Sequence, residues 1–234
     1  MSLDYRAGEF ILINKPYTWS SFQAVNNLKH ALKRHPSLLL DDKLVHLKIG
    51  HAGTLDPLAT GLLIVCTGKK TKEISQFQDL PKEYTGIFFI GATTPCYDKE
   101  KEVNETFSID HISKEMVYEA AKSFIGEQEQ VPPMFSAVKV GGKRLYKLAR
   151  IGEEIELKSR PINILEFEIT ACELPFVHFR IACTKGTYIR SIARDFGLAL
   201  NSGAYLDTLC RTKIGNFSID DAKTPKEYIT DNLY

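Results

Sequence analysis

The sequence lacks any apolar run long enough to cross a membrane. Within its 234 residues, the longest uncharged apolar stretches, 61–66 and 87–90, are far shorter than the roughly 20 residues that a membrane helix needs. The N-terminal residues 1–6 include Asp4 and lack the basic segment followed by an apolar stretch that marks a secretion signal. We therefore expect a cytoplasmic protein that has no membrane contact.

The sequence is also poor in cysteine, and its cysteines are not spaced for a structural role. There are five, an odd number, and no two of them form a C-x-x-C pair. This pattern argues against a disulfide framework and against a structural zinc site. We expect reduced and mostly buried thiols at Cys66, Cys96, Cys172, Cys183 and Cys210.

Nucleotide-binding glycine motifs and internal repeats are absent as well. The sequence contains no G-x-G-x-x-G or P-loop pattern, and its predicted strands and helices follow one another in mixed order. An α+β fold is therefore favoured over a parallel nucleotide-binding sheet. The 44% apolar and 25% charged content excludes a disordered chain. Because single cores grow to roughly 250 residues, we expect one domain over residues 1–234.

Charge is nearly balanced overall but is segregated along the chain. The net charge is +1, which by itself indicates no polyanionic partner. Residues 139–150 carry five bases and no acids, and 176–213 carry six bases and two acids. Acids predominate in 97–129 and 151–175. Such segregation suits a protein with one face on RNA phosphates, although ordinary solvated faces would give the same pattern.

Hydrophobic periodicity predicts a small set of elements. A strand at 10–13 runs into a turn at 14–16, and a helix over 21–34 begins with a capping box of Ser20 and Gln23. A further helix follows Ser113 and ends near Gly126. Strands are predicted at 62–66, 84–90 and 176–183, the last followed by a turn at 184–186 and a helix with a buried stripe of Ile189, Ile192, Ala193 and Phe196.

The most informative stretch is the twelve residues 50–61, which read G-H-A-G-T-L-D-P-L-A-T-G. Asp56 followed by Pro57 fits the start of a very short helical turn that Gly61 would end. That interpretation explains the aspartate and the proline but leaves His51 and Gly53 without a purpose. The pattern G-H-x-G-x-L-D-P-x-A-T-G resembles the catalytic motif of the TruB-type tRNA pseudouridine synthases.

Further segments resemble the same family in the same order, so that the resemblance covers nearly the whole chain. They are N-K-P with W-S-S at 14–21, K-E-Y at 82–84, V-P-P-M-F-S-A with Lys139 at 131–139, K-G-T-Y-I-R at 185–190 and R-T-K-I-G with Phe217 at 211–217. About twenty residues follow Lys213, which we interpret as a form without the C-terminal PUA domain of many bacterial members.

The resemblance implies a fold and an activity. The fold would be the pseudouridine synthase fold, in which a mixed, largely antiparallel central sheet is flanked by helices and loops and carries a catalytic cleft. The activity would be conversion of uridine to pseudouridine in the TΨC loop of tRNA, conventionally at position 55. We expect no metal, no cofactor and no obligatory protein partner, and a monomer that binds the T stem-loop of tRNA.

Three residues are expected to carry the chemistry. The resemblance implies that Asp56 acts as nucleophile or base, by a route that the sequence leaves open. Arg190 lies in a predicted first helical turn, where the dipole disfavours a cation by up to about 1 kcal/mol; the resemblance implies that it pairs with Asp56, the alternative being a solvated surface base. Tyr84 either packs in the core or, as the resemblance implies, stacks on the target base.

Other residues are expected to bind the substrate. The resemblance implies that His51 stabilises the RNA after the target base leaves its stack, although a structural loop histidine is an alternative. Tyr188 either shapes the pocket or packs in the core, and Lys15 either touches the RNA backbone or closes a turn. The basic segment 139–150 would grip tRNA phosphates through Lys139, Lys143, Arg144, Lys147 and Arg150.

Two rival functions remain open from the sequence. One is a noncatalytic RNA-binding or tRNA-folding protein in which Asp56 is only a cap. The other is an enzyme that uses Asp56 to accept a phosphoryl group. The second is disfavoured because no D-x-D pair or acid cluster surrounds Asp56 to hold magnesium.

Overall fold

The computed structural model describes residues 3–33, 35–40, 43–44, 46–136, 139–140, 143–145 and 157–233. The chain divides into two compact units, which are treated separately below. Unit 1 consists of Met1–Tyr84 and Cys210–Tyr234, and unit 2 of Thr85–Leu209. Strands β6 (Lys82–Ile90) and β14 (Ala204–Ile214) contribute residues to both units. The expectation of a single domain stays a prediction.

Unit 1 is built on antiparallel strand pairs. Strand β5 pairs with β1 on one side and with β14 on the other, and β4 also pairs with β5. The strands are β1 (Phe10–Lys15), β2 (Leu39–Leu40), β3 (Lys43–Leu44), β4 (Ile49–Ala52), β5 (Ala59–Thr67) and β15 (Phe217–Ser218). The α-helices are α1 (Ser21–Leu32), α2 (Ile74–Asp79) and α6 (Pro225–Leu233), and the short 3₁₀ helices are η1 (Pro36–Leu38), η2 (Gly68–Glu73) and η3 (Ile219–Asp221).

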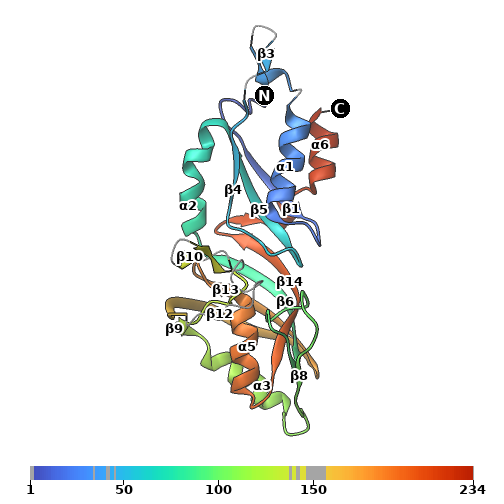
Figure 1. Cartoon of the computed structure of the whole chain (residues 1–234), viewed down its shortest axis with the longest axis vertical. Helices are drawn as coiled ribbons and strands as arrows, with labels where there is room; N and C mark the ends of the chain where they lie inside the picture. The colour runs from blue at the N-terminus through green and yellow to red at the C-terminus, as the bar shows by residue number, and fades with distance from the viewer. Residues whose placement is uncertain are drawn as a thin grey trace. The chain divides into compact units, whose positions relative to one another are not determined.

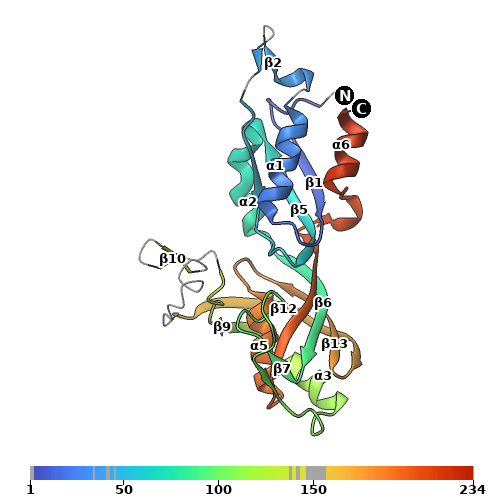
Figure 2. The ribbon, with the colours of Figure 1, turned by 45° about the vertical axis from the view of Figure 1, so that its right-hand side comes forward.

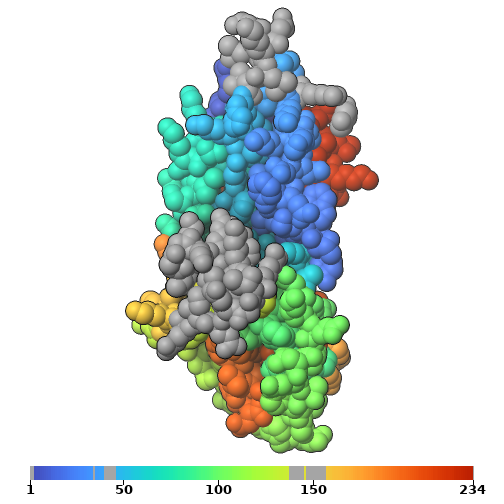
Figure 3. Space-filling model, in the orientation of Figure 1, coloured from blue at the N-terminus to red at the C-terminus, as the bar shows by residue number. Residues whose placement is uncertain are grey.

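Helices α1 and α6 lie side by side in unit 1 (Figures 1 and 2). The capping box that begins α1 is confirmed: Gln23 N donates to Ser20 Oγ at 3.1 Å, and Ser20 N donates to Gln23 Oε1 at 2.7 Å. The helix ends at Leu32, slightly earlier than predicted, and Arg34 lies outside the described residues. In the space-filling view, atoms of α1 (blue) and α2 (teal) form much of the visible surface of unit 1 (Figure 3).

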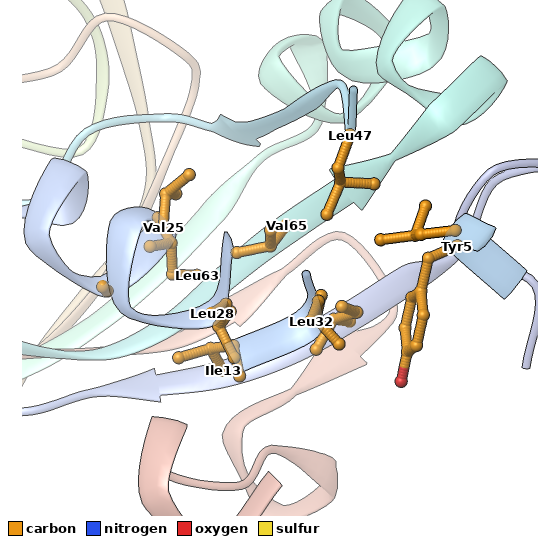
Figure 4. Close-up of a cluster of buried hydrophobic side chains, with 11 residues drawn as sticks. Tyr5, Ile13, Val25, Leu28, Leu32, Leu47, Leu63 and Val65 are labelled. Atoms are coloured by element: carbon orange, nitrogen blue, oxygen red, sulfur yellow. The ribbon is translucent and has the colours of Figure 1, made fainter. Parts of the chain in front are cut away.

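The core of unit 1 lies between α1 and the strands that it covers. Figure 4 shows side chains from β1, α1 and β5 packed together, among them Ile13, Leu28 and Val65. These positions alternate along β1 and recur at helical spacing along α1, so that each of these two elements buries one face, whereas β5 is buried on both faces. Burial of each such aliphatic side chain contributes about 1.5–3 kcal/mol.

Strand β1 is longer than the predicted strand at 10–13. Asn14 and Lys15 do not form a turn but continue the ladder, opposite Leu62 and Gly61 of β5. Ile11, Ile13 and Lys15 alternate inward and are all buried. The prediction of a turn starting at Asn14 was wrong because the long partner strand extends the pairing to Lys15, and the chain reverses only after it.

Unit 2 is a second set of largely antiparallel strands, in the order β14-β6-β13-β12-β9, with helices packed against it. Its remaining strands are β7 (Ala92–Thr93), β8 (Glu105–Thr106), β9 (Gly126–Gln130), β10 (Lys139–Val140), β11 (Lys143–Arg144), β12 (Arg160–Glu173) and β13 (Phe176–Cys183). Its helices α3 (Lys114–Ser123) and α5 (Ile189–Ala199) contact each other (Figures 1 and 2). The bounds of β13 agree with the prediction, and the predicted stripe on α5 is buried.

Aromatic side chains fill the core of unit 2. The rings of Phe88 and Phe179 stack with their centroids 4.2 Å apart, and Phe167 and Phe196 approach each other at 5.5 Å. They bring together β6, β12, β13 and α5. The α+β prediction with a mixed, largely antiparallel sheet is confirmed. The five cysteines are unpaired thiols, four of them buried, which also agrees with the sequence.

None of the helices in the described part of the chain combines the length and the apolar character that crossing a membrane would require.

Gly61 is needed where β5 meets β14. Its φ is +109°, a region that side-chain-bearing residues rarely adopt, and an added Cβ would overlap the backbone of Arg211. Gly53 has a comparable φ of +86°, but a Cβ there would make only an ordinary contact of 3.4 Å with Arg211 Nη1. Backbone strain thus acts at both positions, and steric overlap acts at Gly61 alone.

We expect Gly61→Ala to lower the free energy of unfolding by at least about 2 kcal/mol more than Gly53→Ala, whose cost is the strain of about 1–3 kcal/mol alone. Urea denaturation of both variants, followed by circular dichroism, measures the difference. Equal losses of unfolding free energy in the two variants would contradict this prediction and would show that β14 can move away from position 61.

Candidate active site

Asp56 lies on a tight turn between β4 and β5. Ala59 N donates to Asp56 O at 3.1 Å, which closes a four-residue β-turn with Pro57 in its second position. The carboxylate-bearing side chain is half-buried. The prediction of a short helical turn ended by Gly61 was wrong: the chain makes one β-turn, and Gly61 already lies within β5. Pro57 suits both structures, which is why the pattern could not distinguish them.

Ser21 fixes the residue before Asp56. Leu55 N donates to Ser21 Oγ at 2.8 Å, and the same hydroxyl donates to Leu55 O at 3.1 Å. Ser21 is the first residue of α1 and is buried. The backbone that leads into the turn is therefore attached to the start of a helix rather than to a mobile loop.

Lys15 holds the turn from the other side. Its side chain is fully buried, and its Nζ donates to Pro16 O at 2.9 Å, Trp19 O at 2.5 Å and Pro57 O at 3.3 Å. All three ammonium protons are thus used within unit 1. Of the two roles considered for Lys15, this geometry favours closing a turn over contacting the RNA backbone.

The electrostatics around Lys15 point to the carboxylate of Asp56. Burial lowers the pKa of Lys15 to about 8, whereas the charge of Asp56 opposes this and Arg211 lowers it further. The interaction is mutual, so that the ammonium favours the ionised form of Asp56.

Arg211 is a third anchor, and the sequence analysis did not identify it as such. Its side chain is 1% exposed, its Nε donates to Leu62 O at 2.8 Å, and its Nη2 donates to Gly53 O at 3.0 Å. These two carbonyls bracket the Asp56 turn along the chain. The sequence shows a charged residue within a strand here, as it does at Lys15. It does not show which carbonyls that residue binds.

His51 lies in β4, opposite Val65 of β5, and is partly buried. Its Nδ1 is buried and has no hydrogen-bond partner in the described part of the chain. Burial lowers the pKa of His51, and the nearby charge of Arg211 lowers it further. A neutral imidazole is therefore favoured, and its role toward RNA stays a prediction.

Tyr84, the third residue of β6, is 9% exposed. The burial agrees with the packing alternative for its ring. Stacking on a substrate base stays a prediction.

In unit 2, Arg190 is the second residue of α5 and is 4% exposed, so that it is not a solvated surface base. Its Nη2 donates to Phe135 O at 2.9 Å and its Nη1 to Cys96 O at 3.3 Å. Its Nε lies 3.6 Å from Oδ2 of Asp98. The carboxylate of Asp98 therefore compensates a cation at a helix N-terminus. The predicted pair with Asp56 joins residues of different units and stays a prediction.

Asp98 was not singled out from the sequence. Its side chain is 7% exposed, and Oδ1 accepts hydrogen bonds from Cys96 Sγ at 3.0 Å and Glu100 N at 2.9 Å. These contacts hold the carboxylate in the loop after β7, where it faces the Arg190 guanidinium. Only the three-dimensional proximity of two segments more than ninety residues apart reveals the pair.

Tyr188 immediately precedes α5 and is half-buried. Its N donates to Gln130 Oε1 at 2.8 Å, and its O accepts from Gln130 Nε2 at 3.1 Å. Ser191 Oγ also donates to Val131 O at 2.9 Å. Together with the Arg190 contact to Phe135 O, these bonds attach the first turn of α5 to residues 130–135.

Part of the predicted basic segment 139–150 can be located. Strands β10 and β11 form a two-stranded ladder in which Lys139 lies opposite Arg144 and Val140 opposite Lys143. Lys147 and Arg150 lie outside the described residues. The role of this segment toward RNA stays a prediction. Within the described ranges, no group of three or more His, Cys, Asp or Glu side chains is placed to hold a metal ion.

Comparison with known proteins places these features in a family. Residues 41–189 match the family model described as TruB family pseudouridylate synthase (N terminal domain). The tRNA pseudouridine synthase B of Flavobacterium johnsoniae is 55% identical over 94% of this chain and 93% of its own length. The enzyme of the same name from Parabacteroides distasonis is 50% identical over 96% of this chain and 93% of its own length.

Solved structures show the same fold. A chain of a Cbf5-Nop10-Gar1 complex superposes with a TM-score of 0.71 at 27% identity and covers 97% of this chain. The present chain spans 55% of that chain. A chain from an H/ACA RNP bound to a substrate RNA containing 2′-deoxyuridine gives a TM-score of 0.68 at 24% identity over 97% of this chain and 54% of its own, a likeness of fold alone.

The two hydrogen bonds from Arg211 to Leu62 O and Gly53 O can be tested by their effect on the Asp56 turn. We expect Arg211→Lys to speed amide hydrogen exchange in residues 53–59 by at least about tenfold. The single nitrogen of a lysine cannot take the positions of both Nε and Nη2, and one lost bond contributes about 1.4 kcal/mol. Exchange mass spectrometry measures the rates, with Lys213→Gln, an exposed position on the same strand, as control. Unchanged amide hydrogen exchange in residues 53–59 would show that these two hydrogen bonds do not hold the turn.

Proposed function

The chain belongs to the TruB family of pseudouridylate synthases and is a tRNA pseudouridine synthase, and we propose that it acts on uridine 55 in the TΨC loop with Asp56 as the reacting carboxylate. The reaction breaks the C1′–N1 bond of uridine, rotates the freed base and joins its C5 to C1′; C5 loses its proton and N1 takes one up, so that the product is an isomer of the substrate. No group enters from outside and nothing is oxidised. A positioned carboxylate that serves as nucleophile or base can therefore carry the reaction without a cofactor.

The observation that supports this proposal most strongly is the fixation of the Asp56 turn. Its backbone is bound before Asp56 at Gly53 and Leu55, directly after it at Pro57, and again at Leu62. Two of the anchors, Lys15 and Arg211, are buried cations, and the side chain that they leave half-exposed is a carboxylate. An ionised, immobile acid at a partly open position is what covalent or base catalysis on a nucleotide requires.

Arg190 is proposed to pair with Asp56 and orient it, with Asp98 holding the guanidinium in place. The Asp98 carboxylate lies 3.6 Å from Nε, and the carbonyls of Phe135 and Cys96 bind Nη2 and Nη1. Each of the three guanidinium nitrogens thus has a contact that holds the group in place. We propose further that Tyr84 stacks on the target base, that Tyr188 shapes the pocket and that His51 contacts the displaced RNA.

The proposal predicts a separation of binding from turnover. Asp56→Asn keeps the shape of the side chain and removes its charge, so we expect turnover to fall by at least about a hundredfold while the Kd for tRNA changes little. Release of tritium from C5 of uridine in a tRNA transcript measures turnover, and filter binding measures Kd. Asp221→Asn, an exposed position in unit 1, serves as control.

Turnover of Asp56→Asn within tenfold of the parent would refute the assignment of Asp56. A parent protein that binds the transcript but releases no tritium would instead support a noncatalytic RNA-binding protein. Mapping the pseudouridine in the product checks position 55.

The support of Arg190 by Asp98 predicts a loss in the chemical step. We expect Asp98→Asn to lower kcat about tenfold, equivalent to about 1.4 kcal/mol, with KM nearly unchanged. Single-turnover kinetics measures the step. The control is Asp207→Asn, which removes the partner of exposed Lys99 at 2.9 Å in the same unit. Equal effects of the two substitutions would contradict a specific role for Asp98.

A further inference from the structure

Unit 1 contains a second feature that the proposed chemistry does not use, a basic cavity of about 320 Å³. It is formed where four segments meet: the N-terminal turn, the end of η1, the residues before β4, and η2. Its basic lining residues are Arg6, His46, Lys48, Lys69 and Lys72, over an apolar floor that includes buried Leu47.

The backbone around the cavity is tightly connected. Gly68 N donates to Lys48 O at 2.9 Å, and Lys69 N donates to Ala7 O at 3.3 Å. Gly68 has a φ of +50°, and a Cβ there would overlap the backbone of Arg6. Thr71 Oγ1 donates to Gly68 O at 2.8 Å and fixes the start of η2. The basic side chains therefore project from a framework that the fold holds together.

The charges at this cavity are not neutralised from within. Arg6, Lys48, Lys69 and Lys72 have exposed side chains, and none has an ion-pair partner in the described part of the chain. No aspartate or glutamate among the described residues lines the cavity. The nearby carboxylate of Glu73 is paired with Lys70 at 3.1 Å. Four like charges around one hollow repel each other unless an anion occupies it.

The position of the cavity relative to Asp56 is set by β5. Asp56 lies three residues before this strand begins, and Gly68 follows directly after it ends. Nine residues of a strand, at about 3.3 Å each, separate the two by roughly 30 Å. A ligand in the cavity therefore lies far from the reacting base.

We propose that this cavity binds phosphodiester groups of the substrate tRNA outside the TΨC loop, an inference that rests on tRNA being the substrate. Lysine and arginine side chains that are not engaged in ion pairs are the usual partners of nucleic-acid phosphates, and such contacts orient the RNA without reading its sequence. Among the described residues, the cavity lining includes no aromatic side chain on which a base could stack. The backbone of the RNA, rather than a base, fits this chemistry.

The test uses a double substitution, Lys48→Gln with Lys69→Gln, in the full chain. We expect the Kd for unmodified tRNA to rise about tenfold, and the slope of log Kd against log salt to fall by about two, one for each lysine. The matched control is Lys33→Gln with Lys226→Gln, which removes the same charge from exposed positions next to α1 and on α6. A salt slope equal to that of this control would overturn the proposal.

Phosphorothioate footprinting with iodine locates the contact. The parent should protect phosphates outside the TΨC loop, and the Lys48/Lys69 variant should lose that protection while it keeps protection inside the loop. Loss confined to the loop would overturn the proposal. We expect kcat at saturating tRNA to be unchanged.

These readouts do not depend on product formation. If the parent formed no pseudouridine, the proposed function would fail, but the Kd, salt slope and footprint would still decide whether the cavity binds RNA phosphates.

Discussion

Two buried cations that donate to backbone carbonyls hold the turn on which the chemistry is proposed to depend. Lys15 binds Pro57 O, and Arg211 binds Gly53 O and Leu62 O. Removing such groups from water costs several kcal/mol each, and that cost is offset only where hydrogen bonds and an opposite charge are close. The carboxylate of Asp56 supplies that charge to Lys15. The fixed turn and the ionised acid are thus two consequences of one arrangement.

In unit 2, Arg190 is likewise a buried cation that donates to backbone carbonyls and lies beside a carboxylate. Its guanidinium is almost fully buried and ties the loop near Cys96 to the segment near Phe135 through their carbonyls, with Asp98 as the balancing charge. The first turn of α5 is further fixed by Gln130 and Ser191. In each unit, a charged side chain therefore stiffens segments that are distant in sequence, which is the kind of support that a preorganised site needs.

Much of the fold could be predicted because it is encoded locally. The alternation along β13 and the capping box of α1 are set by neighbouring residues, and both appear in the structure as expected. The twelve-residue motif around Asp56 correctly indicated the family. The shape of that motif was less predictable, since Pro57 fits a helical turn and a β-turn equally well, and the outcome depends on how β14 passes Gly61.

The anchors of the site could not be predicted for a related reason. A carbonyl that accepts a hydrogen bond leaves no trace in the sequence, so the partners of Lys15 and Arg211 emerge only when the strands are paired. Asp98 looked like one acid among many in an acidic segment until it was found beside Arg190. The strand was predicted to end before Asn14 because Asn14 and Pro16 favour a turn locally. Pairing with β5 outweighs that preference and extends the strand to Lys15.

The central claim is that the buried ammonium group of Lys15 favours the ionised form of Asp56, and the most direct measurement is the titration of that carboxyl group. Carbon-13 NMR of labelled aspartate, with the Asp56 signal assigned by its loss in Asp56→Asn, gives the pKa in the parent and in Lys15→Met. The account predicts a higher pKa for Asp56 in Lys15→Met than in the parent, because a buried ammonium group that interacts with the carboxylate has been removed. The same pKa in both proteins would contradict it.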